Sequence, residues 1–122
     1  MGTPAKPVLL HRGNVVLVPF PFTNLAGRKV RPAVIVSPDP QHDDVLVVFV
    51  SSVIPNRLSP TDWLVPADHP EFSMTGLKQT SVLKANKLLT LHRSLIRRRL
   101  GHLGPKTQAE LDQRLLRTVG LA

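Results

Sequence analysis

The chain has 122 residues, 42% of them hydrophobic, which suffices for one domain with its own core and argues against global disorder. It contains no cysteine, so disulfides, thiol catalysis and cysteine-type zinc sites are excluded. Sixteen Lys and Arg against eight Asp and Glu give a net charge of +8. This balance favours a polyanionic partner, nucleic acid or an acidic protein, over a basic surface without a partner.

The N-terminal segment, residues 1–12, contains Pro4 and Pro7 and is predicted to be a flexible leader to one domain spanning residues 13–122. The segment lacks the long apolar stretch and the small-residue cleavage site of a secretory signal. No apolar run in the chain approaches the roughly 20 residues that a membrane helix needs. We therefore expect a cytoplasmic protein with no membrane partner.

Short runs rich in β-branched and apolar residues predict several strands. The predicted strands span residues 15–20, 33–37, 45–51, 61–65, 80–83 and 87–91. Pro19 and Pro21 predict that the first strand ends early or lies at a sheet edge. The third strand is apolar on both faces, so we expect it in the centre of the sheet.

The last part of the chain predicts helical structure. Residues 94–99 are basic and compatible with a helical turn, and residues 107–110 (TQAE) have the pattern of a capping box that begins a helix. An apolar stripe follows, made of Leu111, Leu115, Leu116 and Val119, and Gly120 supplies a stop. Together these elements predict a mainly β fold, a small curled antiparallel sheet with one C-terminal helix packed against it.

A basic segment, residues 28–31 (RKVR), ends at Pro32 directly before an apolar strand. The guanidinium of Arg31 offers a planar fork that matches two phosphoryl oxygens. Pro32 fixes the backbone after it, and the strand beyond would limit reorganisation during a reaction. From position alone, Arg31 is either such a phosphate-binding group or a surface residue near the start of a strand.

Several motifs in order along the chain resemble those of the MazF/PemK family of toxins. They are residues 12–18 (RGNVVLV), 31–37 (RPAVIVS), 49–52 (FVSS), 81–83 (SVL), 89–90 (LT) and 99–103 (RLGHL), followed by the terminal helix. The resemblance covers most of the chain. It implies a homodimeric SH3-like antiparallel β-barrel of the CcdB/PemK type with a C-terminal α-helix.

The resemblance also implies an activity. Family members are translation-halting toxins that cleave single-stranded RNA selectively and without a metal or other cofactor. The ribose 2′-hydroxyl attacks and leaves a 2′,3′-cyclic phosphate and a 5′-hydroxyl. Their partners are the RNA substrate, a second copy of the toxin, and a cognate acidic antitoxin of the MazE type that holds the toxin inactive.

By the same resemblance, Arg31 and Ser51 are the expected catalytic residues. Expected RNA-binding residues are Arg28, Lys29, Ser52, Lys84, Asn86 and Lys87. Three positions depart from the family pattern: Ser51 replaces a Thr, and Asn14 and Asn86 stand where acids occur. An amide does not titrate, so Asn86 cannot act as a general base, and the sequence identifies no acid–base pair.

Other residues leave alternatives open. The five His residues have no ligand-like spacing, so no metal site is expected. Trp63 and Phe72 could stack on bases or lie in the core, and residues 97–99 (RRR) could bind RNA, antitoxin carboxylates or only water. Two alternatives to an RNA-cleaving toxin stay open. One is a non-catalytic toxin of the same fold that binds RNA, or binds gyrase as CcdB does. The other is a basic protein-interaction module.

Overall fold

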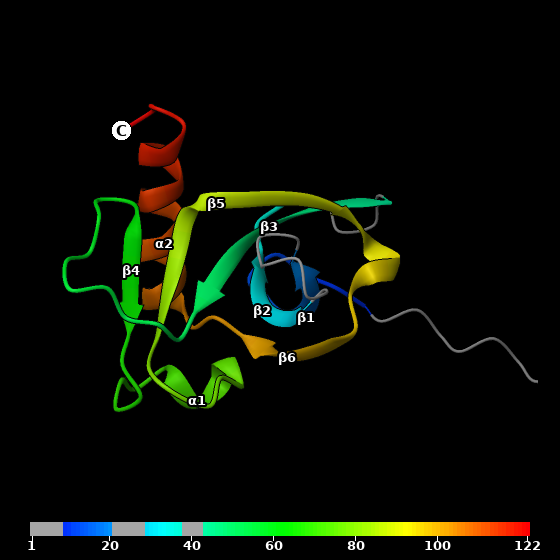
Figure 1. Ribbon diagram of the computed structural model, residues 1–122, viewed down its shortest axis with the longest axis horizontal. Coiled ribbons are helices and arrows are strands. Elements are labelled where there is room, and N and C mark those ends of the chain that lie inside the picture. The colour runs from blue at the N-terminus through cyan, green and yellow to red at the C-terminus, as the bar shows by residue number, and fades with distance from the viewer. Residues whose placement is uncertain (1–8, 21–28, 38–42) are drawn as a thin grey trace, which may run out of the picture.

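The computed structural model describes residues 9–20, 29–37 and 43–122. These residues form one antiparallel sheet of six strands in the order β4-β5-β3-β2-β1-β6 (Figure 1). The strands are β1 (Asn14–Phe20), β2 (Lys29–Ile35), β3 (Asp44–Ser51), β4 (Asp62–Val65), β5 (Ser81–His92) and β6 (Arg98–His102). The helices are α1 (Phe72–Thr75), the 3₁₀ turn η1 (Arg93–Leu95) and α2 (Pro105–Thr118). The predicted fold class is confirmed: the sheet curls into a half-barrel, and α2 stands beside β4 and β5.

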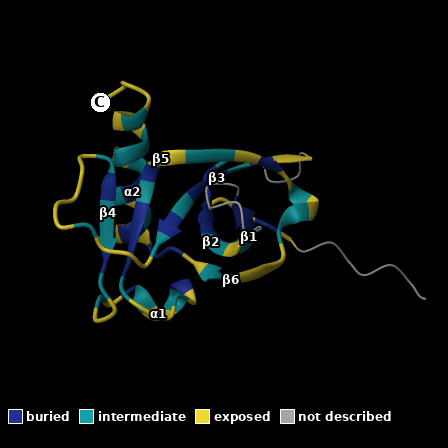
Figure 2. Cartoon of the chain, in the orientation of Figure 1, coloured by how far each residue is buried: buried dark blue, intermediate teal, exposed yellow. Residues whose placement is uncertain are grey.

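Each face of the sheet carries its own apolar core. Adjacent residues of a strand point to opposite faces, and β3 contributes to both cores, as its continuous apolar sequence predicts. Val48 packs with Leu83 and Leu111 on the face covered by α2. Val47 packs with Phe20 and Ile35 on the other face. Figure 2 shows buried residues along the strands and exposed residues in the loops and at the C-terminus.

Of the two alternatives predicted for the first strand, an early end or an edge position, the edge position is wrong, because β1 pairs with β2 on one side and with β6 on the other. Leu17 accepts the Arg97 N–H at 2.8 Å and is the last β1 residue paired with β6. The backbone of Pro19, two residues later, is directed to the β6 side of β1 but lies beyond the last β1–β6 pair. The lack of an N–H at Pro19 therefore costs no hydrogen bond between these strands. Pro21 lies outside the described residues.

The strands predicted at residues 80–83 and 87–91 are one strand, β5, with a bulge in its middle. Val48 of β3 pairs with Leu88, whereas its neighbour Phe49 pairs with Lys84. Residues 85–87 therefore have no partner in β3, and the polar bulge interrupts the apolar pattern that marks the strand. The basic residues 94–99 are also not a helical turn throughout, because η1 ends at Leu95 and β6 begins at Arg98.

The predicted C-terminal helix is confirmed, but the predicted capping box is wrong. The helix α2 begins at Pro105 after Gly104, so Thr107 lies within its first turn. The Thr107 hydroxyl donates to the carboxylate of Glu71, which comes from the segment before α1. The apolar stripe is divided: Leu111 is buried and Leu115 partly buried, while Leu116 and Val119 are exposed.

The first described residues are packed onto the sheet and helix. Leu10 is buried in the core that contains Phe20. The Arg12 guanidinium donates to the Val36 carbonyl oxygen at 2.9 Å and to the Asp112 carboxylate at 2.8 Å. The packed chain therefore extends to at least Leu10, and the domain boundary stays a prediction. Within the described ranges, no helix has the length and apolar character to cross a membrane.

Candidate active site

A pocket of about 540 Å³ opens where β2 and β3 separate. The two strands pair only over residues 33–35 of β2, while β2 remains paired with β1 as far as Lys29. Pro32 has no N–H with which to continue the ladder. Because Ala33 pairs with Phe49, extending the same register by two residues would place Arg31 opposite Ser51. Arg31, Ser51 and Ser52 all line the pocket.

Strand β2 begins earlier than the strand predicted from residue 33, and it includes most of the basic segment. Lys29, Val30 and Arg31 belong to β2 and pair with β1, with Arg31 opposite Val18. Strand alternation then puts Arg31 on the same face as Ala33 and Ile35, which pack in the core containing Phe20. The strand therefore anchors Arg31 at the edge of a buried core. Arg28 lies outside the described residues.

Two other walls complete the pocket. One is formed by residues 76–79, directly after α1, and the other by Arg98 and Leu100 of β6. Lys78 and Arg98 therefore add two cations to that of Arg31. No Asp, Glu or His is among the described residues that line the pocket. The electrostatic character of this lining suits a phosphate group.

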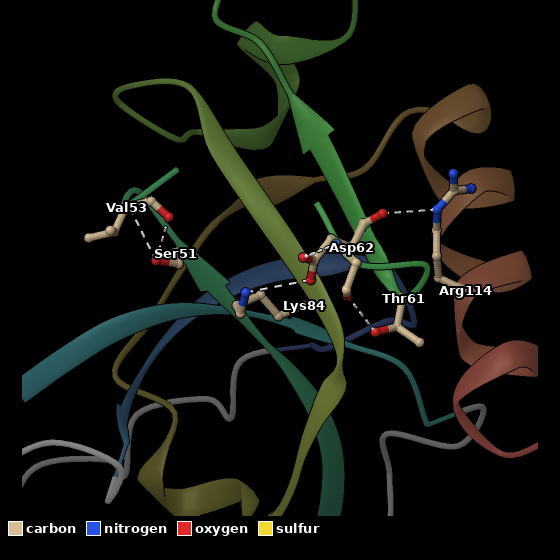
Figure 3. A network of polar contacts seen from close by, with 7 residues as sticks. Ser51, Val53, Thr61, Asp62, Lys84 and Arg114 are labelled. Carbon is tan, nitrogen blue, oxygen red and sulfur yellow. Dashed lines mark hydrogen bonds and ion pairs between the residues drawn. The ribbon is translucent and has the colours of Figure 1, made fainter. Parts of the chain in front are cut away.

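Ser51 has a defined local role at the end of β3 (Figure 3). Its Oγ accepts the Val53 N–H at 3.1 Å, and the hydroxyl lies 3.4 Å from the Val53 carbonyl oxygen. The first bond closes a turn of the kind that serine forms with the backbone two residues on. The second is too long to hold the proton firmly, so the hydroxyl can donate to a phosphate without opening the turn.

Phe49 joins the pocket to the bulge in β5. Its ring lines the pocket and meets the Phe20 ring edge-on, with 4.9 Å between the centroids. The Lys87 ammonium lies 5.5 Å from the Phe49 ring centroid. Lys87 therefore contacts a residue of the pocket lining but does not line the pocket itself. Asn86 is exposed in the bulge and does not line the pocket either.

Lys84 is the predicted RNA-binding residue that the structure separates most clearly from the pocket. Its Nζ lies 3.5 Å from Oδ1 of the buried Asp62 on β4. Figure 3 shows this ion pair. The other carboxylate oxygen of Asp62 accepts the Ser59 N–H at 2.9 Å. Lys84 thus neutralises a buried acid. Lys29 is exposed on β2 and also lies outside the pocket lining.

Three further residues that the sequence singles out, Asn14, Trp63 and Phe72, lie outside the pocket lining. Asn14 is buried, and its Oδ1 accepts the His11 N–H at 2.8 Å, which closes the turn before β1. An amide oxygen can accept this bond as a carboxylate would. Trp63 packs against the core, with the Arg114 guanidinium 4.4 Å from its ring centroid, and Phe72 packs against the same core. The core interpretation of both aromatic residues is thereby favoured.

The sequence did not indicate that Lys78, Gln79 and Arg98 line the pocket. Lys78 and Gln79 follow a long segment whose shape no local pattern determines, and only the fold brings them to the same pocket as Arg31. The arginine triplet at residues 97–99 signals Arg98, but only the pocket lining distinguishes it from Arg97 and Arg99. In the described part of the chain, no group of three or more metal-ligating side chains comes together.

The curled sheet, its terminal helix and the cationic pocket at a strand split define a small β-domain suited to a polyanion. A family model for the PemK-like, MazF-like toxin of type II toxin–antitoxin systems matches residues 11–119, and the chain belongs to this family. The predicted resemblance is confirmed. No curated protein matches the chain closely enough to be compared with it.

Solved structures share the fold at low sequence identity. An endoribonuclease bound to its cognate antitoxin, from a mycobacterial species, has a TM-score of 0.72 and 20% identity, covering 93% of this chain and 98% of that one. The Mycobacterium tuberculosis toxin MazF-mt6 has a TM-score of 0.70 and 18% identity over 89% and 98%. A MazE–MazF structure from Deinococcus radiodurans has a TM-score of 0.72 and 20% identity over 94% and 99%.

Proposed function

We propose that this toxin is an endoribonuclease that cleaves single-stranded mRNA selectively at the pocket between β2 and β3 and so halts translation. The observation that carries the proposal is the placement of Arg31 and Ser51 on one pocket wall, with Lys78 and Arg98 facing the same space. A hydroxyl and three cations around one cavity can hold a phosphate whose negative charge rises during reaction. The endoribonucleases among the structural neighbours support the same activity.

The proposed reaction is an internal transfer that consumes no water. The ribose 2′-hydroxyl loses its proton, its oxygen bonds to phosphorus, and the bond from phosphorus to the 5′-oxygen breaks. The 5′-oxygen takes up a proton, so the products are a 2′,3′-cyclic phosphate and a 5′-hydroxyl. The Arg31 guanidinium and the Ser51 hydroxyl would bind the non-bridging oxygens, where charge accumulates.

The described pocket lining supplies charge but no carboxylate or imidazole for proton transfer. Catalysis would then depend mainly on positioning and on stabilising the phosphate charge. Asn86 remains proposed as an RNA-binding residue, together with Arg28, Lys29, Ser52, Lys84 and Lys87. The ion pair of Lys84 with Asp62 makes it the weakest member of this set.

The proposed assembly is a cytoplasmic homodimer that a cognate acidic antitoxin of the MazE type inactivates. Structural neighbours include an endoribonuclease with its cognate antitoxin and a MazE–MazF complex. A net charge of +8 complements an acidic partner as well as RNA. Sedimentation at micromolar concentration tests the dimer, and a species of single-chain mass would contradict it.

The activity is tested with a long labelled RNA in the presence of EDTA. Wild type should cut it at a limited set of sites, and Arg31→Ala should reduce the rate on the order of 100- to 1,000-fold. Arg117→Ala is a matched control, because Arg117 is an exposed arginine that donates to the Pro60 carbonyl oxygen away from the pocket. A 2′-deoxy substitution at the cut site should abolish cleavage there. Intact RNA with wild type, or equal cutting by Arg31→Ala, would overturn the proposal.

The second candidate is a toxin of the same fold that binds without cutting, and the lack of acid–base groups in the described lining favours keeping it. This candidate predicts salt-dependent RNA retention with the RNA left intact. A gyrase-binding toxin would instead bind gyrase and show no preference for RNA. An RNA-binding assay at two salt concentrations detects the first outcome, and a gyrase-binding assay on the same protein detects the second.

A further inference from the structure

The segment that leads into the pocket wall of residues 76–79 carries a buried carboxylate, that of Glu71. Glu71 precedes α1 and is only 7% exposed. Its Oε1 accepts the backbone N–H and the hydroxyl of Thr107, each at 2.8 Å, and its Oε2 accepts the Lys106 N–H at 3.0 Å. One side chain thus satisfies two unpaired N–H groups of the first turn of α2.

The carboxylate packs closely against the glycine that precedes α2. A Cβ added to Gly104 would lie 2.4 Å from Glu71 Cδ, so only glycine admits the carboxylate at the start of α2. The negative charge also lies at the positive end of the helix dipole. Glu71 therefore joins the segment before the pocket wall to α2 through charge, hydrogen bonds and shape.

Local hydrogen bonds order the segment on both sides of Glu71. The Glu71 N–H is accepted by His69 Nδ1 at 3.0 Å. The Thr75 hydroxyl donates to the Phe72 carbonyl oxygen at 2.6 Å and accepts the Leu77 N–H at 3.1 Å. Leu77 is the neighbour of Lys78, so only α1 and this short turn lie between Glu71 and a cation that lines the same pocket as Arg31.

We propose that Glu71 is a positioning residue for RNA binding, which holds Lys78 and Gln79 on the pocket wall by anchoring their segment to the start of α2. The proposal rests on the proposed function, because it assigns Lys78 and Gln79 to the RNA-facing surface. Lys78 would contact a phosphate beside the scissile one, and the Gln79 amide would meet a base edge. Glu71 itself touches no RNA.

The anchoring is tested without RNA by amide hydrogen exchange on the full chain. Glu71→Gln keeps the shape of the side chain but removes the charge that holds two N–H groups and a hydroxyl. Exchange should accelerate at least severalfold in residues 72–80 and at the start of α2, and much less in β1 to β3. The matched control is Glu110→Gln, which removes a carboxylate of α2 that pairs with Arg114 and lies away from the pocket. Unchanged exchange in residues 72–80 of Glu71→Gln would overturn the anchoring.

The link to RNA is tested by steady-state cleavage of a short substrate, well below the unfolding temperature of each variant. Glu71→Gln should raise KM severalfold with kcat within about twofold of wild type, a pattern that indicates lost binding rather than lost chemistry. Glu71→Asp, whose shorter side chain keeps the charge, should recover part of the effect. Glu110→Gln should leave KM unchanged. A uniform fall in the active fraction, with KM unaltered, would overturn the positioning role.

A double-mutant cycle with Lys78→Ala tests whether Glu71 acts through Lys78. If Glu71 acts through Lys78, the KM increase of the double variant should be clearly smaller than the product of the two single increases. Multiplicative effects would assign Glu71 to stability alone and overturn the proposal. Should wild type neither bind nor cut RNA, the proposed function fails, and the exchange experiment still decides whether Glu71 anchors the segment.

Discussion

Arg31 and Pro32 are adjacent residues with different effects on the site. Pro32 lacks an N–H, and the β2–β3 ladder has no pair beyond Ala33 and Phe49. Arg31 then lies beside the opening that this creates, while its backbone stays paired with Val18 of β1. A cation held by a paired strand beside this opening needs little rearrangement to bind a phosphate.

Ser51 and Ser52 are neighbouring hydroxyls in the same pocket, and their substitution distinguishes them. Ser51→Ala should slow cleavage by about 100-fold, as expected for the loss of one donor to a developing charge. Ser51→Thr should retain activity, because the hydroxyl is kept. Ser52→Ala serves as the control and should have a small effect. A larger loss in Ser52→Ala than in Ser51→Ala, measured as kcat on one RNA, would transfer the role to Ser52.

Lys84 is expected to matter for stability more than for RNA. Lys84→Met leaves the Asp62 carboxylate, which is 6% exposed, without its cation and should lower the free energy of unfolding by about 2 kcal/mol. The double variant Asp62→Asn/Lys84→Met should recover much of this loss, because the amide oxygen can still accept the Ser59 N–H. Urea unfolding measures both. A stable Lys84→Met with weakened RNA binding would instead support the RNA-binding role predicted from the sequence.

At the scale of elements, α1 and β6 approach so closely that only glycine fits at their contact. A Cβ on Gly76 would lie 2.2 Å from the Leu100 carbonyl oxygen, and one on Gly101 would lie 2.2 Å from that of Met74. Leu100 and residues 76–79 line the same pocket. The contact therefore sets the distance between two pocket walls.

Gly76→Ala tests this contact, with Gly120→Ala as its control. Both glycines have positive φ, +72° and +77°, but a Cβ at Gly120 would meet no atom within 4 Å. Gly120→Ala should cost only the left-handed strain of about 1 kcal/mol. Gly76→Ala adds displacement of the backbone and should cost about 3 kcal/mol in urea unfolding. Equal losses in the two variants would show that α1 can move away from β6 freely.

At the scale of the whole molecule, acid should loosen the connection that Glu71 makes between the segment before α1 and the start of α2. Burial raises the pKa of Glu71, but the N–H groups of Thr107 and Lys106, the Thr107 hydroxyl and the nearby His69 outweigh it. The pKa is therefore lowered from its ordinary value of 4.5. A carboxyl group with a lowered pKa stabilises the fold above its unfolded pKa, and this stability is lost as pH falls through the folded pKa.

The prediction is a pH-dependent difference between wild type and Glu71→Gln. Wild type should be the more stable protein at pH 6, and the difference in free energy of unfolding should shrink as the pH is lowered below about 4.5. Urea unfolding of both proteins at several pH values measures it. Because every other titrating group is common to both proteins, their difference reports Glu71. A difference that stays constant from pH 6 to pH 3 would contradict the assignment.

Much of the fold could be predicted because its signals are local. The apolar runs of β1 and β3, the stripe containing Leu111 and the basic RPAVIVS motif all lie within short windows of sequence. β6 escaped prediction because its RRLGH sequence has no alternating pattern and its strand character comes from pairing with β1. The helix start was also misassigned, because its cap, Glu71, is 36 residues away from Thr107 in the chain.

The sequence by itself determined a basic, cysteine-free β-domain of the toxin family, with Arg31 and Ser51 as the leading candidates for catalytic residues. Charge, periodicity and ordered motifs are properties of the chain alone. Only the tertiary structure decided which cations share a cavity. It separated Lys84 from the pocket through Asp62 and brought in Lys78, Gln79 and Arg98. The physical reason is that pocket walls come from the ends of strands distant in sequence, and their meeting depends on where a ladder stops, where glycine permits contact and which buried charge finds a partner.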